Sequence, residues 1–142
     1  MPIFSIPIEP IALEADNYHF FIAVKIGVKS ARLLLDTGAS RTAFDNEKFL
    51  KFTKGKHFNP LEVQSVGLGS NEVFTTISSL SSIKFGELKL THVEVAVLNL
   101  SHVNAAYQNI NVPEIDGVLG ADLLMKLKAT INLKKLELKL IG

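Results

Sequence analysis

One apolar run in this sequence ends abruptly in a carboxylate. Leu33, Leu34 and Leu35 are followed directly by Asp36, and the small or polar residues Thr37-Gly38-Ala39-Ser40 come next. Three leucines in a row predict a buried strand. An ionised aspartate at the tip of such a strand is costly unless its position serves a purpose. Asp36 is therefore either the start of an ordinary Asx turn or a reactive acid at the edge of the core.

The composition describes one globular domain and excludes several chemistries. The chain has 142 residues, of which 47% are hydrophobic and 20% charged, so residues 1–142 are expected to form a single packed domain. It contains no cysteine, which excludes a disulfide framework, a thiolate zinc site, an iron–sulfur cluster and a cysteine nucleophile. The formal net charge of +1 is small for a nucleic-acid-binding protein, so no nucleic-acid partner is expected.

Most of the chain is predicted to form β-strands joined by short turns. A hairpin is expected where residues 18–25, rich in aromatic and β-branched side chains, turn at Gly27 into residues 31–35. Other strands are expected over 3–8, on both sides of 67–71, on both sides of 85–87, and over 91–100, 115–120, 129–133 and 136–140. Short helices are expected over 46–49, after the N-cap Asp45, and over 122–128. The polar segments 51–60 and 101–113 are predicted to be loops, so the fold class is all-β with one or two short helices.

A second informative segment lies far downstream of Asp36. The apolar residues Val118 and Leu119 are followed by Gly120 and then by the predicted helix. The simplest interpretation of this segment alone is a buried strand that turns into a helix at the glycine.

Taken together, the two segments resemble the motifs of the retropepsin-like aspartic proteases, and the chain is most similar to the non-viral, single-domain branch. The resemblance implies an all-β acid-protease barrel in which Asp36 is the catalytic acid. It implies that the active-site loop is supported by Thr37, Gly38, Val118, Leu119 and Gly120. It also implies that the substrate main chain is bound by Gly38, Ala39 and Ser40.

The chemistry of this family needs two carboxylates that share one proton, and the chain has a single Asp-Thr-Gly segment. Asp116 precedes Gly117 without the intervening threonine, so it is not expected to be the second acid. The simplest solution is a homodimer whose twofold axis passes between two copies of Asp36. The resemblance implies that Thr37 forms a hydrogen bond across this axis. It implies a peptide or protein substrate and no metal or cofactor.

A flap is expected to close over the bound peptide, which lies extended and is held like an added strand. The candidate flap is the turn at Gly67, Leu68 and Gly69, because glycines let the backbone bend and approach a peptide closely. An ordinary surface hairpin remains the alternative.

Two features depart from the viral members of the family. In those, an acidic residue after the Asp-Thr-Gly-Ala stretch pairs with an arginine just after the second-motif glycine, whereas this chain has Ser40 and Ala121 at these places. The apolar terminal segments, residues 3–8 and 136–140, look like strand edges that need cover. A dimer interface and pairing within the chain are equally able to provide it. The chain is also longer than the viral enzymes, mainly in the two predicted loops, which either line the cleft, cap it or join the interface.

The remaining side chains suggest no other chemistry. The histidines form no close ligand pattern, so no metal site is expected; they are His19, His57, His92 and His102. Arg41, directly after the motif, is either a substrate contact or an exposed side chain. No secretory signal and no membrane-spanning run is recognised, so a cytoplasmic location and no membrane partner are expected. Two functions stay open: an aspartic endopeptidase, or a catalytically inactive module of the same fold that binds a peptide or protein.

Overall fold

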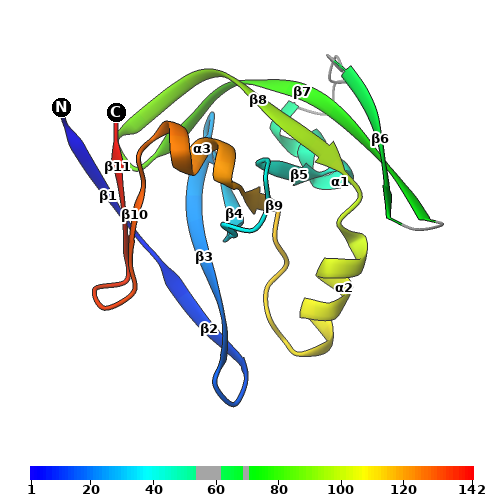
Figure 1. Ribbon diagram of the computed structural model, residues 1–142, viewed down its shortest axis with the longest axis horizontal. Coiled ribbons are helices and arrows are strands. Elements are labelled where there is room, and N and C mark those ends of the chain that lie inside the picture. Colours follow the sequence, from blue (N-terminus) through cyan, green and yellow to red (C-terminus); the bar gives the residue numbers. More distant parts are fainter. Residues whose placement is uncertain (54–61, 69–70) are drawn as a thin grey trace.

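The computed structural model describes residues 1–53, 62–68 and 71–142, and only the backbone over 62–68 and 71–74. Strands dominate, as the alternating and β-branched segments predict (Figure 1). In chain order the elements are β1 (Ile3–Pro7), β2 (Glu9–Glu14), β3 (Asn17–Ile26), β4 (Lys29–Leu35), β5 (Ala43–Asp45), α1 (Asn46–Phe49), a 3-10 helix (Leu50–Thr53), β6 (Glu62–Leu68), β7 (Asn71–Phe85), β8 (Leu88–Leu98), α2 (Ser101–Asn109), β9 (Gly117–Leu119), α3 (Ala121–Lys126), β10 (Thr130–Asn132) and β11 (Glu137–Ile141).

The main sheet curls into a barrel-like ring. Its strand order is β2-β3-β4-β9-β5-β8-β7-β6, and a further pairing of β3 with β7, at Lys25 and Lys84, brings the curled sheet back on itself. The long strands β7 and β8 arch over the other elements in Figure 1. The predicted all-β class with short helices is confirmed.

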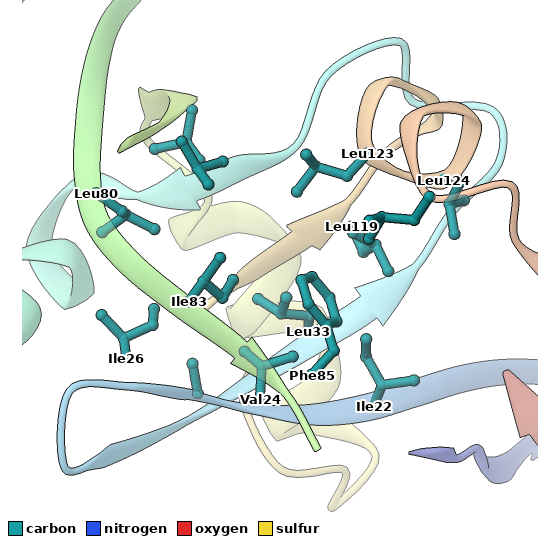
Figure 2. Packing of buried hydrophobic residues seen from close by; sticks show 14 of the residues in the cluster. Ile22, Val24, Ile26, Leu33, Leu80, Ile83, Phe85, Leu119, Leu123 and Leu124 are labelled. Carbon is teal, nitrogen blue, oxygen red and sulfur yellow. The ribbon is translucent and has the colours of Figure 1, made fainter. Parts of the chain in front are cut away.

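The main core fills this ring. In β3 the buried residues Ile22, Val24 and Ile26 alternate with exposed ones, which is the pattern of a strand with one face on the core. They pack with Leu33 of β4 and with Phe85 of β7, as Figure 2 shows. The same cluster includes Leu119, Leu123 and Leu124, so the strand and helix of the second motif are anchored in the core.

The predicted loop over 101–113 is wrong in its first part, because residues Ser101–Asn109 form the helix α2. The side-chain oxygen of Asn99 accepts a hydrogen bond from the Ser101 N–H (2.8 Å) and so helps to start the helix. Asn104 and Tyr107 face inward and are buried. Polar side chains made the segment look like surface loop, although the buried asparagine has its hydrogen-bonding groups satisfied inside the protein.

The two ends of the chain pair with each other. In the second sheet, of order β1-β11-β10, Ile3 lies opposite Ile141 and Ile6 opposite Leu138. The N- and C-terminal ends are therefore neighbours in Figure 1. Of the two ways to cover the terminal edges, pairing within the chain is the one found.

Several element boundaries differ from the prediction. The expected second helix ends at Lys126, because Lys128 has a φ of 47° that an α-helix cannot contain. The polar segment 51–60 begins with the last three residues of the 3-10 helix, and 54–60 lie outside the described residues. The N-cap at Asp45 is confirmed, since its side chain accepts a hydrogen bond from the Lys48 N–H (3.1 Å). Among the described residues, no helix is long and apolar enough to cross a membrane.

Candidate active site

The two sequence motifs meet because one strand is inserted between two others. β9 lies between β4, to which it is parallel, and β5, to which it is antiparallel. The loop from Asp36 to Thr42 connects β4 to β5 and so crosses the end of β9. Leu35 lies beside Leu119, and the Asp36 N–H donates to the Leu119 carbonyl (3.1 Å). The two segments that the family resemblance links therefore lie side by side.

The carboxylate of Asp36 is held by its own loop. The Gly38 N–H donates to Asp36 Oδ1 (2.9 Å), and the Ala39 N–H donates to the Asp36 carbonyl (3.2 Å). A Cβ added at Gly38 would lie 3.2 Å from that same Oδ1, so glycine permits this tight turn. The Asx-type turn is therefore real, and it does not compete with the catalytic interpretation. Among the residues that the structure describes, no hydrogen bond or ion pair engages Oδ2 of Asp36.

The exposed part of this loop lies around the half-buried Asp36. Thr37, Gly38 and Ser40 are exposed, and Ala39 is half-buried. Arg41 is exposed in the single chain, and both of its interpretations stay open. The loop therefore presents main chain and small side chains beside the carboxylate.

Gly120 packs closely against the backbone of the loop over 36–42. A Cβ at this position would lie 2.5 Å from the carbonyl carbon of Arg41 and 2.9 Å from the oxygen of Ala39. The next residue, Ala121, donates its N–H to the Ala39 carbonyl (2.7 Å). Only glycine allows this close backbone contact. Gly117 is equally constrained, because a Cβ there would collide with the carbonyl oxygen of Ala43.

Thr42 and Asp122 form a link that sequence reasoning missed. Thr42 is fully buried, and its Oγ1 donates to Asp122 Oδ1 (2.8 Å) while accepting from the Gly120 N–H (3.1 Å). Asp122 Oδ1 also accepts from the N–H groups of Thr42 and Leu123 (2.8 Å each). This link joins the loop over 36–42 to α3. In this link the acidic residue, Asp122, lies in the helix. The positions compared with the viral members, Ser40 and Ala121, are not part of the link, so that comparison did not reveal it.

Asp116 serves a structural purpose. It is buried, its Oδ2 accepts from the Arg32 N–H (2.8 Å), and its Oδ1 forms an ion pair with Lys51. Its main chain bonds to both neighbouring strands, with the carbonyl accepting from Asp45 N–H (2.9 Å). Both carboxylate oxygens of Asp116, which directly precedes β9, are therefore engaged in contacts within the chain. Within the described part of the chain, no other carboxylate forms a hydrogen bond with Asp36.

Tyr107 of α2 is a further polar group in the electrostatic environment of Asp36. It is 4% exposed, and a hydrogen bond of 2.7 Å joins its hydroxyl to His19 Nδ1 on β3. Burial raises the pKa of the Tyr107 phenol, the Arg32 guanidinium lowers this pKa, and the negative charge of Asp36 raises it. The sequence had suggested no role for Tyr107, since it lies in the segment predicted to be a loop.

The candidate flap is only partly described. The backbones of β6 and β7 pair as an antiparallel hairpin, with Gly67 opposite Glu72 and Leu68 opposite Asn71. Gly67 and Leu68 therefore belong to a strand, and Gly69 at the turn lies outside the described residues. In Figure 1 the paired strands β6 and β7 extend away from the ring. Its role as a flap stays a prediction.

No metal site is built by the described residues, because no three His, Asp or Glu side chains among them lie close enough together to hold an ion. His57 lies outside the described residues. His19 forms a hydrogen bond with the Tyr107 hydroxyl, and His92 and His102 are exposed.

Comparison with known proteins agrees with this geometry. A sequence profile described as aspartyl protease matches residues 22–123. No curated protein matches the chain. A retropepsin-like aspartic protease from Rickettsia conorii has a similar structure, with a TM-score of 0.59 and 20% identity over 98% of this chain and 90% of that one.

Two more solved structures share the fold. The retroviral protease-like domain of Ddi1 from Leishmania major has a TM-score of 0.55 and 14% identity, over 80% of this chain and 81% of that one. The EIAV protease in complex with an inhibitor has a TM-score of 0.54 and 18% identity, over 87% of this chain and 100% of that one. The profile match spans both motifs and the strands between them, and the chain therefore belongs to the aspartyl protease family, with a retropepsin-like fold.

Proposed function

We propose that this protein is an aspartic endopeptidase that acts as a homodimer, with one Asp36 from each subunit. The observation that carries the proposal is the state of Asp36 at the tip of β4. Its Oδ1 is held by the Gly38 N–H (2.9 Å), while the residue is only half-buried in a single chain. A half-buried carboxylate with Oδ1 held by a main-chain N–H, and with no hydrogen bond to Oδ2 from the described residues, is suited to bind a water molecule and a second carboxylate.

The two acids work as a pair. Two carboxylates a few ångströms apart cannot both ionise easily, so they share one proton, and the resulting pKa values belong to the pair. The ionised Asp36 takes a proton from the water as it attacks the peptide carbonyl, and the protonated Asp36 donates to the carbonyl oxygen. The tetrahedral diol then collapses and the C–N bond breaks. The Asp36 that took the proton from water donates it to the leaving amine nitrogen, and the other Asp36 takes a proton back from a diol hydroxyl, which restores the pair. No covalent intermediate with the enzyme is needed.

The exposed face of the loop supports the dimer. In the single chain the loop exposes Thr37, Gly38 and Ser40 to solvent. A twofold axis beside these residues would bring the two Asp36 carboxyls together. Thr37 would then bond to the partner's loop, and Gly38, Ala39 and Ser40 would bind the substrate main chain. Because the chain termini pair with each other, this dimer does not depend on exchange of terminal strands.

The rival function is a peptide- or protein-binding module without hydrolysis, which uses the same cleft and lacks only the paired acids. Asp36→Asn separates the two, because it keeps the size and shape of the side chain but cannot supply the shared charge. Cleavage of a peptide library, followed by mass spectrometry, should fall by about 10²–10⁴-fold. Asp16→Asn, in the exposed turn between β2 and β3, is the matched control. Cleavage that survives Asp36→Asn contradicts the enzyme assignment.

Mixing subunits tests the two-copy acid pair itself. If Asp36→Asn subunits exchange freely with an equal amount of wild type, only dimers of two wild-type chains keep both acids. Activity per wild-type chain should then drop to about half. Unchanged activity per chain, or an active species that sediments as a monomer, would show that one subunit suffices.

A further inference from the structure

Three lysines from three different strands lie in a row on the main sheet. β3 and β7 are joined where Lys25 lies opposite Lys84, and Lys84 in turn lies opposite Lys89 of β8 on its other side. Residues directly opposite each other in antiparallel strands have side chains on the same face of the sheet. The lysine row, Lys25-Lys84-Lys89, therefore crosses three neighbouring strands where the curled sheet returns on itself.

The lysine row is on the outer face of the ring. The residues next to the three lysines in sequence are buried in the main core; they are Val24, Ile26, Ile83, Phe85 and Leu88. Because side chains alternate along a strand, the lysines point away from that core. Lys25 and Lys89 are exposed, and Lys84 between them is half-buried.

The three positive charges repel one another. Neighbouring strands are about 4.8 Å apart, so the three side chains start within a width of about 10 Å. Like charges directly opposite each other destabilise a sheet, and the lysine row contains two such pairs in succession. Within the parts of the chain that the structure describes, no ion pair engages any of the three lysines. A bound polyanion would relieve this repulsion, so the row is suited to a negatively charged partner.

The size and surroundings of the lysine row favour an acidic protein segment over other polyanions. Basic clusters that recognise anionic lipids have about 4–8 lysines or arginines, and proteins that bind single-stranded nucleic acids add aromatic side chains on which bases stack. Two positions away from the lysines along the same face lie Ala23, Ser82 and Thr91. None of these is aromatic or bulky, so a peptide can approach closely, and the two hydroxyls can donate hydrogen bonds to its carboxylates.

We propose that the lysine row is a docking site for an acidic segment of another protein, whose Asp or Glu side chains form ion pairs with the three ammonium groups. The site is separate from the candidate active site. Lys25 lies opposite Ser30 near the start of β4, whereas Asp36 follows the end of that strand, about 20 Å further along the chain direction. The docking site therefore goes beyond the proposed function and does not depend on it.

The test measures binding of a fluorescein-labelled hexaglutamate peptide to the full chain by fluorescence anisotropy at low ionic strength. Hexaglutamate should bind, hexaglutamine should not, and added salt should weaken the binding. Lys84→Gln should weaken it by about fivefold, and replacing all three lysines by glutamine should remove it. Lys134→Gln, at an exposed position in the turn between β10 and β11, changes the net charge equally and should leave the affinity unchanged.

A stability measurement tests the lysine row itself, without a ligand. Because Lys84→Gln removes both like-charge contacts, it should raise the urea midpoint at low ionic strength, and salt should reduce the difference from the wild type. Lys134→Gln should not raise the midpoint. An unchanged midpoint in Lys84→Gln would contradict the repulsion from which the proposal is argued.

Three binding results would overturn the docking site or its partner. Equal affinity of Lys84→Gln and wild type for hexaglutamate overturns the docking site. An equal loss in Lys134→Gln does the same, because binding would then follow net charge alone. If an oligonucleotide or an anionic lipid vesicle binds more tightly than hexaglutamate, and Lys84→Gln weakens that binding, the acidic protein segment is the wrong partner.

Discussion

Replacing Thr42 by valine should loosen the loop over 36–42 without changing the shape of the side chain. Thr42 Oγ1 donates to Asp122 Oδ1 (2.8 Å) and accepts from the Gly120 N–H (3.1 Å). A hydrogen bond to a charged group contributes about 1.5–3 kcal/mol, and a buried N–H left without a partner costs about 1–3 kcal/mol. Asp122 keeps the N–H groups of Thr42 and Leu123, and the valine methyl offsets part of the loss. The expected fall in the free energy of unfolding is about 2–4 kcal/mol.

Urea denaturation followed by far-UV circular dichroism measures this loss, because the chain has no tryptophan to report unfolding by fluorescence. In a chain of this length, about 1 kcal/mol corresponds to about 3 °C in melting temperature, so Tm should fall by about 6–12 °C. Thr130→Val, at an exposed position of β10, is the matched control and should change stability by less than about 0.5 kcal/mol. Equal stability of Thr42→Val and Thr130→Val would refute the assignment of this link as the anchor of the loop.

Two other changes test the remaining contacts of the site. Gly120→Ala forces a methyl group against the backbone of Arg41 and Ala39, so it should destabilise the fold by about 3 kcal/mol or more and abolish cleavage. Gly27→Ala, whose methyl meets open space but has a φ of 62°, should cost about 1–2 kcal/mol and retain cleavage; similar losses of cleavage in both would argue against a specific role of Gly120. Because burial raises the pKa of Tyr107 above its unfolded value of about 10, the stability from its neutral form is complete below pH 10 and declines as pH rises through the folded-state pKa. The urea midpoint should therefore decline less steeply above pH 10 in Tyr107→Phe than in the wild type, and parallel declines would contradict the burial of the phenol.

The elements that could be predicted were those with a local cause. The hairpin of β3 and β4 follows from a β-branched segment and a turn glycine, and the α1 cap follows from the side chain of Asp45. The helix α2 was missed because its inward side chains include an asparagine, whose amide is paired with the main chain of Ile115 beyond the end of the helix. Local polarity cannot reveal a hydrogen bond partner that only the fold supplies.

The linear order of residues drew attention to Asp36, because a carboxylate directly after an apolar strand is costly unless its position serves a purpose. Gly120 alone looked like an ordinary turn between a strand and a helix, and only the likeness of its segment to a family motif made it a candidate. The same likeness also favoured the adjacency of the two segments. Only the tertiary structure decided which contacts hold the two segments in place. Thr42 and Asp122 are common residue types, and nothing in the sequence pairs them. They become a pair because the insertion of β9 between β4 and β5 brings distant parts of the chain within hydrogen-bonding distance.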